Sequence, residues 1–241
     1  MPLYPLGISR CRDVPSVPVQ AAGAIDMRWS LSEDLACAFI DAPHHAVPPM
    51  LHAAALEAIH RRICVLPVRF GVALRDETEI RSMLDDRRHE LLDHLNRLDW
   101  TCEMGLRIAP PTTGSLPRPP SEIQAAASPK GTVPFSLTRK SGQSPPQSPL
   151  AYMEGRRSYY RRADENAERD RSIVQQFVEY LHGYYRQWRK LPSSPTCPVR
   201  LAFLVERDRV AAFRNRVEST CRTDQEGRCA ILGPWPPYSF V

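Results

Sequence analysis

The sequence predicts an α+β fold of two small sandwich domains of the ferredoxin-like, split βαβ type. In each half of the chain, short apolar runs and amphipathic helical patterns follow the order strand, helix, strand, helix, strand. A proline-rich stretch separates the two halves. We therefore expect an N-terminal domain over residues 1–109, a linker over 110–149 and a C-terminal domain over 150–241 that contains a long amphipathic helix.

The first half of the chain contains several predicted strands and two predicted helices, of which the helix over Glu77–Leu98 has the clearest pattern. Strands are predicted over Leu3–Ile8, Ile25–Trp29, Leu35–Ile40 and Trp100–Ile108. Helical stripes of apolar residues run over Leu51–Ile59 and Glu77–Leu98. These elements predict an antiparallel sheet that carries both helices on one face.

The run Val65–Gly71, VLPVRFG, lies between the two helices. Its valines, leucine and phenylalanine favour a strand, and Pro67 places that strand at an edge or a bulge because proline lacks a ladder donor. Arg69 is a fixed charge within this apolar run. Either the side chain points to solvent or pairs with a carboxylate, or it marks a place where a partner protein docks.

The middle of the chain, from Ala109 to Pro149, contains ten prolines among Ser, Thr, Gly and Gln. Such a composition buries too little apolar surface to offset the entropy of ordering, so we expect a largely disordered linker. Beyond it, strands are predicted over Leu150–Met153, Val199–Val205 and Cys229–Leu232. A long helix is expected from about Asp164 to Lys190, and a second helix that Asp208 caps.

The chain ends in Gly233–Val241, GPWPPYSFV. Its prolines restrict the backbone to extended geometry, and Trp235, Tyr238 and Phe240 then present large apolar faces. Such a segment either packs on its own domain or docks on a partner. The residues alone favour packing on its own domain.

The two motifs together resemble the gas vesicle GvpL/GvpF family. The resemblance rests on VLPVRFG, the long amphipathic helix and short strand after it, and the terminal GPWPPYSFV, and it runs from Leu3 to Val241 with a gap in the middle. It implies a non-enzymatic assembly or minor structural protein of gas vesicles, found on the vesicle and in the cytoplasm. It also implies contacts with the small apolar shell protein and other accessory proteins, without a cofactor. The candidate partner-binding residues are Arg69, Phe70, Trp235, Tyr238 and Phe240.

Composition favours a cytosolic protein and implies no strong polyanion partner, so no specific binding of nucleic acid is expected. The net charge is +5, because 27 acidic residues offset 32 basic ones. No apolar run is long enough to span a bilayer, and the N-terminus lacks the layout of a signal peptide. The seven cysteines include no CxxC pair and are odd in number, so neither a disulfide framework nor a zinc site is predicted.

No motif in the sequence predicts catalysis or a metal site. His89 and His94 are five residues apart, so on a helix they cannot share one metal ion as an i, i+4 pair does. His44 and His45 lie in a proline-rich loop without other ligands nearby. Neither a phosphate-binding glycine loop nor a GxSxG elbow is present. Two alternatives remain: an RNA-binding α+β module, although the aromatic RNP run of an RRM is missing, and a small-ligand regulatory domain.

Overall fold

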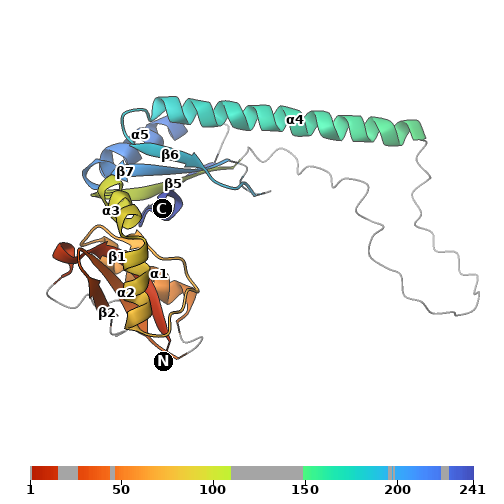
Figure 1. Ribbon diagram of the computed structural model, residues 1–241. Coiled ribbons are helices and arrows are strands. Elements are labelled where there is room, and N and C mark those ends of the chain that lie inside the picture. Colours follow the sequence, from red (N-terminus) through yellow and green to blue (C-terminus); the bar gives the residue numbers. More distant parts are fainter. Residues whose placement is uncertain are drawn as a thin grey trace, which may run out of the picture. The chain divides into compact units, whose positions relative to one another are not determined.

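Two four-stranded antiparallel sheets dominate the computed structural model (Figure 1), which confirms the α+β class. It describes residues 2–15, 27–43, 47–109, 149–194, 197, 199–223 and 228–241. The strands are β1 (Leu3–Arg10), β2 (Met27–Ser32), β3 (Leu35–Asp41), β4 (Leu66–Pro67), β5 (Thr101–Ala109), β6 (Gln187–Lys190), β7 (Val199–Glu206) and β8 (Arg228–Trp235). The helices are α1 (Pro49–His60), α2 (Glu77–Asp86), α3 (Arg88–Arg97), α4 (Pro149–Tyr180) and α5 (Val210–Thr223).

The described chain divides into two units. Met1–Pro110 and Phe177–Val241 together form one compact unit, which contains both sheets. Pro111–Gln176, with most of α4, forms the other. The predicted linker lies outside the described residues up to residue 148, so its disorder stays a prediction, as do the domain boundaries drawn from it.

The first sheet has the strand order β2-β3-β1-β4 and is covered on both faces. Alternate residues of β3 explain why, since Cys37 and Phe39 pack with α2 and α3, whereas Ala38 and Ile40 pack with α1. The expected arrangement, with both helices on one face, therefore differs from the observed one. An apolar run without alternation, LACAFI, is the sequence sign of a strand buried on both sides.

The second sheet has the order β6-β7-β5-β8. Strand β5, which we assigned to the N-terminal domain, lies between β7 and β8 in this sheet and pairs with both. The prediction placed a strand here correctly but in the wrong sheet, because periodicity shows that a strand forms and not which strand it pairs with. Phe203 of β7 packs against Tyr185 and Phe213, with ring centroids 5.1 and 5.3 Å away.

One apolar cluster joins the two sheets, and Figure 1 shows α3 and the C-terminal end of the chain between them. The cluster combines residues of both sheets, α2, α3 and the terminal segment: Leu3, Ile8, Leu35, Cys37, Phe39, Cys64, Leu66, Ile80, Leu84, Leu91, Leu95, Leu98, Ala202, Leu204 and Phe240. Because these side chains are buried together, the two sheets share one core.

Several element boundaries differ from the sequence prediction. The helix expected over Glu77–Leu98 is interrupted at Arg87, whose backbone (φ −115°, ψ 17°) is not helical. Leu150–Met153, predicted as a strand, lies in the first turn of α4, where Pro149 is tolerated.

The other differences lie in the second half of the chain. Helix α4 ends at Tyr180 rather than near Lys190, and Gly183 with φ +86° follows it. Asp208 lies in a short 3-10 turn before α5.

Candidate interaction surface

The Arg69 loop, which we define as Arg69–Ala73, bulges out of the first sheet. Val68 donates to Leu6 at 2.9 Å, and after the loop Leu3 and Leu74 exchange two backbone hydrogen bonds of 2.8 and 2.9 Å. The chain thus leaves β1 after Val68 and rejoins it at Leu74. The ladder of VLPVRFG is shorter than predicted, because β4 covers only Leu66–Pro67.

Arg69 and Phe70 are both exposed in this loop. Within the part of the chain that the structure describes, the Arg69 guanidinium has no hydrogen bond and no ion pair. Phe70 is 46% exposed and meets the His52 ring of α1 edge-on, with 5.6 Å between the ring centroids. Arg69 therefore pairs with no carboxylate of the described residues, which leaves solvent exposure and the docking of a partner as the alternatives. The loop presents a cation next to an aromatic residue in the sequence.

The terminal segment, Gly233–Val241, begins inside the second sheet. Trp235 pairs with Glu103 of β5, and the register shifts between Glu103 and Gly105. Gly233 has φ +102°, and a Cβ there would lie 2.6 Å from the Glu103 carbonyl oxygen. Only glycine fits this position. The indole of Trp235 lies over Gly105 and stays 36% exposed.

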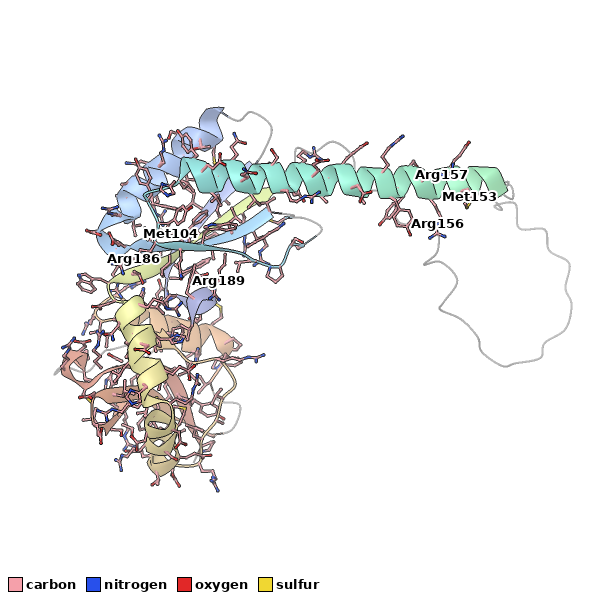
Figure 2. The ribbon with its side chains drawn as sticks, turned by 45° about the horizontal axis from the view of Figure 1, so that its top comes forward. Met104, Met153, Arg156, Arg157, Arg186 and Arg189 are labelled. Atoms are coloured by element: carbon pink, nitrogen blue, oxygen red, sulfur yellow. The ribbon has the colours of Figure 1, made fainter. Side chains whose placement is uncertain are left out.

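A buried carboxylate fixes the end of the chain. The two Glu103 oxygens accept hydrogen bonds from the Ser239 amide at 2.7 Å and the Ser239 hydroxyl at 2.8 Å. Burial raises the pKa of Glu103, while both Ser239 bonds and the charge of Arg189 oppose that shift. Figure 2 shows Arg189 on β6, close to the position where the terminal segment lies. Its guanidinium is 5.4 Å from the centroid of the Phe240 ring and donates to the Ser239 carbonyl.

Phe240 is fully buried in the shared core, and Arg97 of α3 donates to its carbonyl oxygen at 2.8 Å. The preference for packing on the chain's own fold therefore agrees with the position of Phe240. It also separates the three terminal aromatics, since Trp235 and Tyr238 remain accessible and Phe240 does not.

Helix α1 has a residue near each of the two motifs. His52 of α1 meets Phe70, and Glu57 of α1 is close enough to affect Tyr238. Burial raises the pKa of Tyr238, and the carboxylates of Glu57 and Glu103 add to the shift. Two exposed aromatic side chains, Phe70 and Tyr238, therefore lie near residues of one helix.

This fold and these motifs match a known family over most of the chain. The family model described as gas vesicle synthesis protein GvpL/GvpF matches residues 44–241. The chain belongs to the GvpL/GvpF family. The resemblance seen in the two sequence motifs is confirmed.

Relatives and solved structures agree with the family. The chain is 28% identical to gas vesicle protein F of Streptomyces sp. (strain CB03234) over 249 aligned residues, covering all of both chains. It is 27% identical to gas vesicle protein L of the same strain over 191 residues, which cover 79% of this chain and 67% of that protein. The crystal structure of GvpF from Anabaena sp. PCC7120 is similar with a TM-score of 0.72 and 18% identity, over 99% of this chain and 95% of that one. GvpF from Microcystis aeruginosa gives a TM-score of 0.71 and 13% identity, over 99% and 98%.

Sequence reasoning missed two residues of this GvpL/GvpF chain that bear on the surface. Met50, in the first turn of α1, is 81% exposed. Trp100 is 61% exposed and is stacked under the guanidinium of Arg207, 4.9 Å from its ring centroid. A methionine after two prolines and a tryptophan between a helix and a strand gave no periodic signal.

Arg207 also explains a buried histidine at the junction of the two sheets. Its guanidinium donates to His60 Nδ1 at 3.0 Å and to the Ile63 carbonyl at 2.9 Å. Burial and the neighbouring Arg207 charge lower the pKa of His60 to about 3. The imidazole is therefore neutral near pH 7 and can accept this hydrogen bond, which ties α1 to the end of β7.

The described residues offer no constellation for catalysis by a bound metal. Among them, no three His, Cys, Asp or Glu side chains are placed to hold a metal ion. His94 of α3 instead lies 3.3 Å from Arg97, and His44 and His45 fall outside the described residues. Of the helices that the structure describes, none combines the length and apolar character needed to cross a membrane.

Proposed function

We propose that this GvpL/GvpF chain is a non-enzymatic assembly or minor structural protein of gas vesicles, the gas-filled buoyancy organelles. In this role it binds the small apolar shell protein or another accessory protein, in the cytoplasm and on the vesicle. Membership of a gas vesicle synthesis family over residues 44–241 supports the role. The observation that carries the binding site is the exposed Arg69–Phe70 pair, whose cation has no partner among the described residues.

The chemistry of the surface suggests what the partner presents. Phe70, Met50 and Tyr238 expose apolar area next to α1, and Arg69 adds one fixed positive charge. Aromatic residues and arginine dominate binding energy at interfaces because they bury large areas at low entropy cost. We propose that the partner docks an apolar segment that carries a carboxylate, with the carboxylate on Arg69 and the apolar side chains on Phe70 and Met50.

Trp235 and Tyr238 are the second part of the proposed surface. Both are accessible, and both are fixed by the strand and the Ser239–Glu103 hydrogen bonds around them. A rigid aromatic side chain loses little entropy when a partner covers it. Phe240 contributes by holding the segment in place, since it is buried.

The RNA-binding alternative draws no support from the sheets. An RRM binds bases on an open sheet face that carries aromatic residues. In the described residues, Thr101–Leu106 of β5 and Leu201–Val205 of β7 are buried without alternation. Strand β7 contacts α5, and its Ala202 and Leu204 belong to the shared core. These strands therefore do not present an open, aromatic sheet face of the RRM type.

Vesicle formation tests the proposal directly. In a host that carries the whole gas vesicle gene cluster, this chain is replaced by variants with Arg69→Ala and Phe70→Ala. Vesicle yield is measured as pressure-sensitive light scattering and by electron microscopy. We expect the double variant to lose most vesicles while its cellular level and melting temperature stay those of the wild type.

Two control variants show whether the loss of vesicles is specific to Arg69 and Phe70 or follows from removing any exposed side chain. Arg75→Ala removes an exposed arginine that pairs with Glu79, and Leu31→Ala removes a 53% exposed apolar residue on β2. Both should support normal vesicles. If the double variant at Arg69 and Phe70 also does so, the proposed surface is wrong even though the family role stands.

A photo-crosslinking phenylalanine analogue at position 70 identifies the partner. Illumination of cells during vesicle formation should join this chain to the shell protein or to another gas vesicle protein, identified by mass spectrometry. The same analogue at position 31 is the control. Crosslinks that occur equally at both positions would contradict a specific site at Phe70.

A further inference from the structure

Two of the seven cysteines meet where α5 ends and β8 begins. Cys221 lies in the last turn of α5, and Cys229 is the second residue of β8. The two thiols are hydrogen-bonded to each other. Both cysteines are reduced and only half-buried. Small oxidants can therefore approach a pair of thiols that are already within hydrogen-bonding distance of each other.

The other five cysteines lack one of these properties. Three are buried, which raises the pKa of Cys37 to about 12 and the pKa values of Cys64 and Cys102 to about 11. The other two are half-buried, but each thiol donates to a backbone carbonyl: Cys11 to Leu35 at 2.8 Å and Cys197 to Val199 at 3.4 Å. Thiol reactivity requires access and ionisation, so these five thiols are poor candidates for oxidation.

We propose that Cys221 and Cys229 form a redox-sensitive dithiol that closes to an intramolecular disulfide when hydrogen peroxide oxidises it. In the first step a cysteine thiolate attacks one peroxide oxygen, the O–O bond breaks, and a sulfenic acid and one water form after uptake of a proton. In the second step the other thiol attacks the sulfenic sulfur, the S–O bond breaks, and a second water leaves. The two sulfur atoms lose two electrons, and one peroxide becomes two waters.

The hydrogen bond with Cys221, followed by burial, raises the pKa of Cys229. The contact brings the second thiol within reach of a sulfenic acid on either cysteine, so either sulfur can attack peroxide and the other can resolve the sulfenic acid. The bond closes the ring from residue 221 to residue 229 and ties α5 to the strand that leads into the terminal segment.

The sequence between the cysteines makes the bond easy to detect. Trypsin cleaves after Arg222 and Arg228, which both lie between Cys221 and Cys229. Reduced protein therefore releases the peptides 217–222 and 229–241 separately, whereas the disulfide keeps them joined. The experiment uses the full-length chain, purified in reductant, transferred to buffer without it and treated with a small excess of hydrogen peroxide.

We expect the oxidised chain to lose about 2 Da, to yield the joined peptide and to melt several degrees higher, because the ring restricts the unfolded chain. Reductant should reverse all three changes. Cys229→Ser and Cys221→Ser should not yield the joined peptide and should instead accumulate a sulfenic acid on the remaining cysteine, which dimedone traps. Cys197→Ser is the matched control and should behave as wild type.

The wild-type peptide map alone can overturn the proposal, so it does not depend on the variants folding. The proposal is wrong if the joined peptide is absent after peroxide treatment, or if peroxide joins any other two cysteines instead. Vesicle formation does not enter this test, so its result is independent of the proposed function.

Discussion

The Arg69 loop lies just after Pro67, and the terminal segment contains three prolines of its own. Both regions contain a glycine with positive φ and expose an aromatic side chain, yet the fold holds them differently. Gly71 has φ +91°, and a Cβ atom added there would have no neighbouring atom within 4 Å. A Cβ atom added at Gly233 would collide with the Glu103 carbonyl oxygen. The loop side chains Arg69 and Phe70 are exposed, whereas Ser239 and Phe240 are held by the second sheet and the shared core.

The difference shows that two segments with similar residues can have different roles, one proposed in binding and one in folding. Stability depends on how much apolar surface a residue buries and on whether its polar atoms are paired. A region that contributes little to stability can change partners freely, because its residues are not committed to the core. We therefore expect substitutions in the terminal segment to affect folding and those in the Arg69 loop to affect binding.

The largest expected effect is that of Phe240→Ala. Phe240 is fully buried between the two sheets, so its loss removes apolar contacts and leaves a cavity. The free energy of unfolding should fall by about 3–5 kcal/mol, measured by urea denaturation. Tyr238→Ala, in the same segment but 45% exposed, is the control and should cost less than about 1 kcal/mol. Equal losses for both variants would mean that Phe240 does not join the sheets.

The two glycines test the same comparison at the backbone. Alanine at either position adopts an unfavourable left-handed conformation, which costs about 1–2 kcal/mol. Gly233→Ala should cost clearly more than Gly71→Ala, because only its Cβ would lie 2.6 Å from a backbone oxygen. Thermal unfolding of both variants measures the difference. A larger loss for Gly71→Ala would show that the loop, and not the terminal segment, is the rigid region.

The buried carboxylate should make stability depend on pH. The pKa of Glu103 in the folded chain lies above its usual value of 4.5, mainly because of burial. Between pH 4.5 and the folded pKa, Glu103 is more often protonated in the folded chain than in the unfolded chain. Its contribution to the free energy of unfolding is therefore fully present below about pH 4.5 and is lost as pH rises through the folded pKa.

Glu103→Gln isolates this contribution. At acidic pH the wild type and the variant should differ little, because a protonated carboxyl and an amide are similar in shape. Towards neutral pH the stability of the wild type should fall relative to that of the variant. Parallel stability curves between pH 4 and 8, from urea denaturation, would show that Glu103 titrates normally.

The smallest expected effect on folding is that of Arg69→Ala. Its guanidinium has no partner among the described residues, so the free energy of unfolding should change by less than about 0.5 kcal/mol. Urea denaturation of the purified variant measures this. A loss of several kcal/mol would indicate a buried ionic contact and would remove the contrast between the two regions.

The sequence by itself determined the α+β class, the family and most of the secondary structure. The reason is local, since period-2 and period-3.6 patterns, prolines and turn glycines act on neighbouring residues. The strand at Val199–Val205 and the amphipathic pattern of α2 and α3 are examples. Both surface motifs were also visible in the sequence, because a charge in an apolar run and three aromatics among prolines are unusual.

Only the tertiary structure decided which strands pair, which faces are buried and which motif residues stay accessible. Strand β5 joined the second sheet, helices covered both faces of the first, and Phe240 entered the core while Tyr238 stayed outside. The contact between the thiols of Cys221 and Cys229 is also decided by the tertiary structure. Such features depend on contacts between residues far apart in the chain or on different elements. A single sequence carries no local pattern for those contacts.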